Sequence, residues 1–146
     1  MGGTYVLDIA LARPVTLVVG ALGSHAFDAG RYAYVGSAFG PGGFARVDRH
    51  RELARGERDV RHWHVDYLLG HASATLTGVV TFPGEDRECA LARTLPGSAV
   101  TGFGASDCDC RGHLLAAPDG TTPTDAAAEA GGVALGDGET GRSLER

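Results

Sequence analysis

The sequence predicts a small mixed domain of the α/β (α+β) class, in which strands and helices share one core. Three segments combine β-branched and aromatic residues and read as strands, at residues 4–10, 31–38 and 75–82. Two others, residues 44–55 and 60–71, place apolar residues at the i, i+3 and i+4 spacing of an amphipathic helix. With 146 residues, the chain is long enough for one domain with a modest core.

The remaining elements have weaker local signals. Residues 15–20 read as the hairpin partner of the first strand, because an Arg-Pro turn signal separates the two. A third helix is expected from about residue 85 to 95, directly after a Pro-Gly turn. Residues 113–116 form a last short apolar segment. The elements together predict several strands and about three helices.

The last part of the sequence differs in composition from the rest. Residues 118–146 are rich in Gly, Ala, Thr and acids, and contain almost no large apolar residues. They hold two Arg and six acidic residues, whereas residues 1–117 hold 11 Arg and 12 acidic residues. This composition predicts a folded domain over residues 1–117 and an acidic, disordered tail over residues 118–146.

Several classes of protein do not fit the sequence. No stretch reaches the roughly 18 apolar residues needed to cross a bilayer, and the first residues lack a basic signal-peptide region. We therefore expect a cytoplasmic protein with no membrane partner. The three cysteines cannot all pair within one chain, so thiols or metal ligands are expected rather than a disulfide framework.

The distribution of arginine points to an anionic partner. A net charge of −5 argues against nucleic acid for the chain as a whole. Residues 44–64, however, contain six Arg, three His and only four acids. Gly42 and Gly43 precede this segment, and their small size lets backbone amides and a helix N-terminus approach a phosphate. This segment is therefore basic enough to bind nucleic acid, although the chain as a whole is acidic.

An ordered series of motifs resembles a known family. The sequences GTY at residues 3–5 and YVG at residues 34–36 resemble the two halves of the signature of the GIY-YIG nuclease superfamily. GFARVDRH at residues 43–50 is similar to its arginine-bearing helix, and RECALARTL at residues 87–95 to its later, glutamate-bearing helix. The phrases YVGSAFGPGG, RHWHVDYLL and GFGASDCDCRGHL resemble the archaeal branch known as domain of unknown function 123.

The resemblance implies a fold and an activity. The fold would be a three-stranded antiparallel sheet flanked by helices, to which this chain adds a hairpin. The activity would be an endonuclease that needs one Mg²⁺ or Mn²⁺, in a process such as DNA repair, and we expect DNA rather than RNA as the substrate. The residues implied are the paired tyrosines Tyr5 and Tyr34, the phosphate-binding Arg46, one of His50, His62 and His64 near the water, and the metal ligand Glu88.

The chemistry of phosphodiester cleavage calls for the same residue types. The non-bridging oxygens need a positive group, and the planar fork of arginine meets phosphate well, which adds Arg49 to Arg46 as a nucleic-acid contact. The attacking water needs a base, and histidine titrates near neutral pH. A single carboxylate with waters is a common way to bind Mg²⁺, which fits Glu88. The alternative is a nucleic-acid-binding module of the same fold with a degenerate site.

A second cluster offers a different hypothesis. Cys108, Cys110 and His113 have nearly the spacing of zinc ligands, and Cys89 would complete a Cys₃His tetrahedron. Cysteines are also common as small buried apolar residues. Three alternatives therefore stay open here: structural zinc in the nuclease-like domain, Asp107 and His113 lining the nuclease cleft close to Glu88, or a small zinc- or thiol-dependent binding protein.

Overall fold

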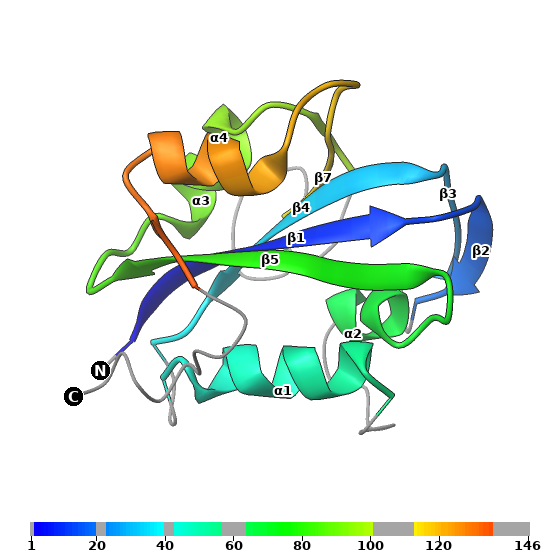
Figure 1. The fold of residues 1–146 in the computed structure, drawn as a ribbon, viewed down its shortest axis with the longest axis horizontal. Coiled ribbons are helices and arrows are strands. Elements are labelled where there is room, and N and C mark those ends of the chain that lie inside the picture. Colours follow the sequence, from blue (N-terminus) through cyan, green and yellow to red (C-terminus); the bar gives the residue numbers. More distant parts are fainter. Residues whose placement is uncertain (1, 20–22, 40–42, 57–63, 101–112, 136–146) are drawn as a thin grey trace.

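A six-stranded antiparallel sheet runs through the centre of the computed structural model, which describes residues 2–19, 23–39, 43–56, 64–100 and 113–135 (Figure 1). The strand order is β6-β7-β4-β1-β5-β8. Three strands are long: β1 (Gly3–Leu11), β4 (Gly30–Ser37) and β5 (Ala74–Pro83). The short strands are β6 (Ser98–Ala99), β7 (Leu114–Ala116) and β8 (Val133–Ala134).

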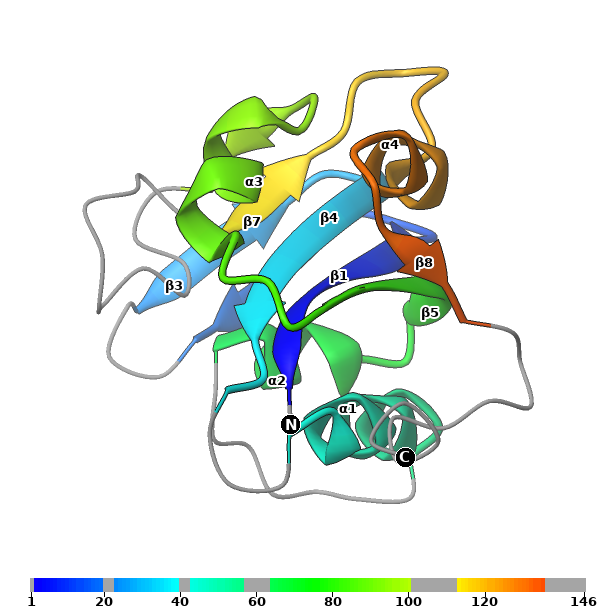
Figure 2. The same ribbon diagram turned by 90° about the vertical axis from the view of Figure 1, so that its left-hand side faces the viewer.

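Helices cover both faces of this sheet. α1 (Ala45–Ala54) and α2 (His64–Leu69) lie on one face, and α3 (Glu88–Thr94) and α4 (Pro123–Glu129) lie on the other (Figures 1 and 2). Side chains of β1 alternate between the two faces. Tyr5 and Leu7 belong to the hydrophobic cluster under α1 and α2, whereas Val6 belongs to the cluster under α3 and α4. The central strand is therefore buried on both sides.

The three-stranded sheet expected from the sequence is too small. β4, β1 and β5 form its centre, but β7 and β6 extend it beyond β4, and β8 extends it beyond β5. The three additional strands have only two or three residues each, which is too short for a period-2 pattern to be seen in the sequence. The mixed α/β class and the antiparallel pairing are as expected.

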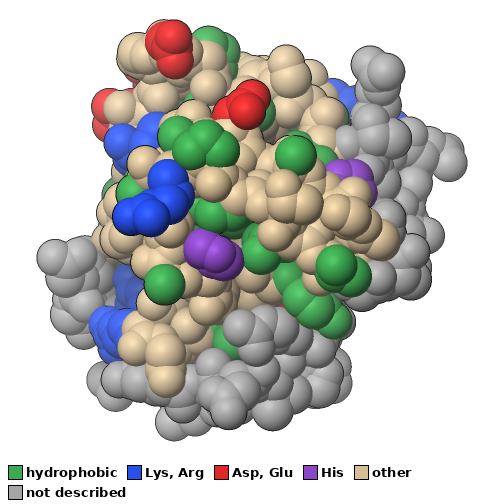
Figure 3. Space-filling model, turned by 90° about the vertical axis from the view of Figure 1, so that its right-hand side faces the viewer, with side chains coloured by type: hydrophobic (Ala, Val, Ile, Leu, Met, Phe, Trp, Pro, Cys, Tyr) green, Lys and Arg blue, Asp and Glu red, His purple; other side chains and the backbone are tan. Residues whose placement is uncertain are grey.

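The hairpin pairing was also wrong. β2 (Val15–Val18) was expected to pair with the first strand, but it pairs with β3 (Ser24–Phe27) in a separate two-stranded sheet. The reason is that both edges of β1 are already occupied along their length by β4 and β5. On the face at the end of the molecule that carries β2 and β3, hydrophobic, basic, acidic and histidine side chains are interspersed (Figure 3).

The prediction of a disordered tail is wrong over residues 118–135. This segment forms α4 and β8, and Ala127 of α4 is fully buried against the sheet. Small residues allow this close packing: a Cβ on Gly132 would overlap Val80, so the lack of large side chains is part of the fit. Composition indicated too little apolar surface, but Ala127 is buried and Gly132 lies close against Val80 of β5. Residues 136–146 lie outside the described residues.

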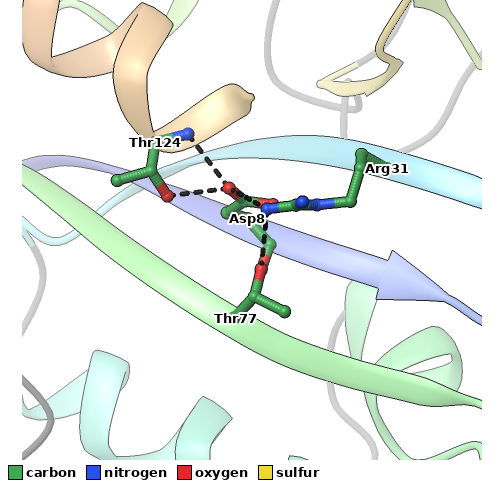
Figure 4. A network of polar contacts seen from close by, with 4 residues as sticks. All are labelled: Asp8, Arg31, Thr77 and Thr124. Carbon is green, nitrogen blue, oxygen red and sulfur yellow. Dashed lines mark hydrogen bonds and ion pairs between the residues drawn. The ribbon is translucent and has the colours of Figure 1, made fainter. Parts of the chain in front are cut away.

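A buried carboxylate holds α4 on the sheet. Asp8 of β1 is 1% exposed and binds Arg31 of β4 through both oxygens, at 3.0 and 2.8 Å (Figure 4). Thr124 of α4 donates its backbone N–H to Asp8 at 3.1 Å and its hydroxyl at 2.7 Å. Thr77 of β5 accepts from Arg31 and donates to the Asp8 carbonyl. Asp8 therefore joins three strands and one helix.

Among the described helices, none is long and apolar enough to cross a membrane. The longest of those given above, α1, has 10 residues.

We predict that Asp8→Ala destabilises the protein by about 1–3 kcal/mol, because the backbone N–H and hydroxyl of Thr124 lose their acceptor, whereas the Arg31 side chain is 39% exposed and keeps contact with solvent. Urea unfolding followed by circular dichroism measures this effect. Glu129→Ala is the matched control, because it removes an exposed carboxylate from α4 itself. Equal stabilities for the two variants would contradict the role given to Asp8.

Candidate functional site

The two predicted tyrosines lie on adjacent strands and on the same face of the sheet. In the register of β1 and β4, Tyr34 is opposite Leu7 and Gly36 is opposite Tyr5. The tyrosines are therefore diagonal neighbours, and their ring centroids are 6.4 Å apart. A Cβ on Gly36 would lie within 2.5 Å of the Tyr5 hydroxyl oxygen, so only glycine leaves room for the Tyr5 ring there.

The first motif also positions the start of α3. A Cβ on Gly3 would lie 2.9 Å from the backbone nitrogen of Gly84, so the strand passes very close to the turn that follows β5. The buried Thr4 hydroxyl donates to the carbonyl of Glu85 at 2.7 Å and accepts from the backbone N–H of Arg87 at 2.8 Å. The Gly-Thr pair that precedes Tyr5 thus fixes the backbone directly before α3.

His50 of α1 meets both tyrosines. Its Nε2 lies 2.8 Å from the Tyr5 hydroxyl oxygen, and its ring centroid is 5.5 Å from that of Tyr5 and 6.3 Å from that of Tyr34. His50 is fully buried, together with Val47 and Leu53 on the same face of the helix. The sequence named His50 as a histidine near the attacking water, and the structure places it inside the core.

Asp66 of α2 completes the cluster from the other side, and sequence reasoning assigned it no role. Its Oδ1 lies 3.4 Å from Nδ1 of His50, and its Oδ2 accepts a hydrogen bond from Arg49 at 3.0 Å. The side chain of Asp66 is 0% exposed. Charged residues are almost never fully buried unless paired. An acid inside the apolar stretch VDYLL was the one signal in the sequence.

Burial keeps these groups in their neutral forms. It raises the pKa of Tyr5 well above its ordinary value, with a further increase from Tyr34 that Arg46 opposes. The pKa of Tyr34 is also raised by burial, and then by the charge of Glu88. Burial lowers the pKa of His50, and the contact with Asp66 counteracts part of this change. At neutral pH both tyrosines are therefore protonated and His50 is uncharged.

Arg46 and Glu88 act on the tyrosine pair from different elements. Arg46 of α1 donates to the backbone carbonyl of Ser37, and its charge lowers the pKa of both tyrosines. Glu88 is the first residue of α3, and its side chain is 26% exposed. Its Oε2 lies 3.4 Å from Nδ1 of the buried His113. Its charge acts on Tyr34. The structure thus brings Tyr5, Tyr34, Arg46 and His50 together, with Glu88 in electrostatic reach.

Other predicted site residues are placed elsewhere or are not described. Arg49 lies against Asp66, and Gly43 adopts a positive φ of 52° in the turn before α1. His64 begins α2, and Cys89 is partly buried on α3. Gly42, His62, Cys108 and Cys110 lie outside the described residues. The zinc hypothesis depends on two of these four and stays a prediction.

Glu88 is the candidate ligand for the divalent metal that the resemblance implies. Within the described ranges, no group of three or more His, Cys, Asp or Glu side chains could hold a metal ion. Mg²⁺ is normally bound by one or two carboxylates with several waters, so a single partly exposed carboxylate suits it. Glu88 fits this description, because a quarter of its side chain reaches solvent.

The comparison with known families identifies the chain at the level of the family. The model of the family described as a domain of unknown function, DUF123, matches residues 4–134. The protein therefore belongs to this family, and the match includes α4 and most of the segment that had been expected to be a tail. No curated protein and no solved structure gives a significant match.

We predict that His50 makes folding stability depend on pH. Its pKa is lower in the folded state than the ordinary value of 6.5, so the unfolded chain binds the proton more readily. The contribution of His50 is complete above about pH 6.5 and is lost as the pH falls through the pKa of the folded state. Urea unfolding at pH 7, 6 and 5 should show a decreasing free energy of unfolding.

Replacement of His50 by Gln should remove this part of the pH dependence, whereas His25→Gln on the β2–β3 hairpin should keep it. If His50→Gln and the wild type lose stability in parallel between pH 7 and 5, another group is responsible.

Proposed function

We propose that the protein is a GIY-YIG-like endonuclease that hydrolyses phosphodiester bonds of nucleic acid, preferentially DNA, with the help of a divalent ion. The observation that carries the proposal is the convergence of Tyr5, Tyr34 and His50, with ring centroids 5.5–6.4 Å apart, beside the charge of Arg46. These residues come from two strands and a helix, in the order in which the superfamily signature presents them.

Each group has a role that its surroundings support. Arg46 is the positive group next to the tyrosines, so it would bind a non-bridging phosphate oxygen. Tyr5 and His50 form a short path for a proton, because 2.8 Å separates the hydroxyl oxygen from Nε2. Glu88 would hold Mg²⁺ or Mn²⁺, which when bound supplies positive charge for the phosphate and the leaving oxygen. His113 contacts that carboxylate and would orient it.

A second candidate is a nucleic-acid-binding module of the same fold without catalysis. One observation favours it: Tyr5 is 1% exposed and His50 0% exposed, so the tyrosine hydroxyl is deep in the protein. Burial also opposes formation of a tyrosinate. In this case Arg46 would still contact phosphate, and Glu88 would have no metal-dependent function.

The experiment that separates the two candidates uses plasmid DNA, branched DNA and RNA, each with Mg²⁺, Mn²⁺ or EDTA. We predict that the wild type cleaves DNA only with a divalent ion. Glu88→Gln should reduce the rate by about 10²–10³, since loss of one charge-stabilising group typically has this effect. Binding of DNA should be retained, because the substitution removes a negative charge and keeps the shape.

Glu85→Gln is the matched control, because Glu85 is an exposed acid three residues earlier whose carboxylate contacts Arg87. Its cleavage rate should equal that of the wild type. Cleavage by Glu88→Gln at the wild-type rate would place the metal elsewhere. A wild type that binds DNA without cutting any substrate would favour the binding module.

A further inference from the structure

We propose that Asp66 is a positioning residue, which holds His50 in the tautomer with hydrogen on Nδ1 and stabilises the imidazolium that forms when His50 takes the proton of Tyr5. This inference rests on the proposed function and deepens it, because it names a residue outside the motifs on which that function is based. It also has a part, the tautomer of His50, that can be measured without any activity.

The contacts of Asp66 define the tautomer. An ionised carboxylate can only accept hydrogen bonds. Its Oδ1 faces Nδ1 of His50 at 3.4 Å, so this nitrogen is the one that carries hydrogen. The lone pair of Nε2 then points to the Tyr5 hydroxyl, 2.8 Å away, and Tyr5 is the donor. The three groups lie in the order carboxylate, imidazole and phenol, all buried.

Arg49 keeps this carboxylate ionised in a place without solvent. Its guanidinium lies 3.0 Å from Oδ2 of Asp66, and the Arg49 side chain is only 18% exposed. A buried carboxylate without such a partner would take up a proton, and a protonated Asp66 could donate to Nδ1 and select the other tautomer. Arg49 and His50 are neighbours on α1, so each oxygen of Asp66 has its own partner on that helix.

The order of carboxylate, imidazole and phenol allows a proton to pass from the attacking water through Tyr5 to His50 during the proposed hydrolysis. The attacking water transfers a proton to the Tyr5 oxygen while Tyr5 transfers its own proton to Nε2 of His50. The water oxygen forms a bond to phosphorus, the bond from phosphorus to the leaving oxygen breaks, and the leaving oxygen takes a proton from solvent. His50 becomes an imidazolium directly opposite the Asp66 carboxylate. The extra proton on His50 returns to solvent after the step.

The test is the tautomer of His50 in the full-length protein, measured by the nitrogen chemical shifts of its ring. In the wild type we expect hydrogen on Nδ1. Asp66→Asn should reverse the tautomer, because the amide group of asparagine can donate to Nδ1 and leave hydrogen on Nε2. In the cleavage assay the same variant should lose about 10²–10⁴ in kcat, the range for general acid–base catalysis, with little change in DNA affinity.

Asp48→Asn is the matched control, because it also converts an aspartate to asparagine, at a partly exposed position on α1. It should keep both the tautomer and kcat. A wild type with hydrogen on Nε2 would overturn the inference, and this measurement needs no variant that might fold poorly. An Asp66→Asn protein with an unchanged tautomer and an unchanged kcat would overturn it as well.

Failure of the proposed function would look different. A wild type that has hydrogen on Nδ1 but cleaves no substrate would reject the endonuclease and the proton path with it. The assignment of the tautomer to Asp66 would then still be supported by its reversal in Asp66→Asn.

Discussion

The contact between the Tyr5 hydroxyl and Nε2 of His50 is the interaction on which the candidate site depends. It joins the central strand of the sheet to α1 at a distance of 2.8 Å, in a place without solvent. Gly36 leaves the space that the Tyr5 ring occupies, and Asp66 of α2 approaches the opposite nitrogen of His50. Because buried polar groups are costly unless they have partners, each of these residues depends on the others.

Among the described residues, one buried aspartate lies on each side of the sheet, and the two have different kinds of partner. Asp8 lies under α4 and is bound by an arginine and by a backbone N–H and hydroxyl of Thr124, groups with no function in proton transfer near neutral pH. Asp66 lies on α2, against α1, and binds Arg49 with one oxygen while the other faces His50. The imidazole of His50 can take and release a proton. The first arrangement holds a helix in place, whereas the second is suited to orient a base.

Local sequence patterns predicted the long strands and helices. They did not predict the short strands, α4 or the contacts of Asp66, because these depend on contacts between segments far apart in the sequence. The spacing of apolar residues predicted α1. The motifs named Tyr5, Tyr34 and His50, and the rings of these three residues lie close together in the structure. The role of Asp66 was missed because its partner is 16 or 17 positions earlier, on another helix. α4 was missed because its segment has almost no large apolar residues, which suggested that it could bury too little surface. The burial of α4 depends instead on how closely alanine and glycine let it approach β5.

The most direct test of this account is the hydroxyl proton of Tyr5, observed by nuclear magnetic resonance in the full-length protein. We expect this proton to exchange slowly with water and to show a scalar coupling to Nε2 of His50, across the hydrogen bond. Tyr32 is an internal reference, because its hydroxyl donates to the backbone carbonyl of Asp28 and can have no coupling to a ring nitrogen. A Tyr5 hydroxyl proton that exchanges rapidly and has no coupling to His50 would contradict the central claim.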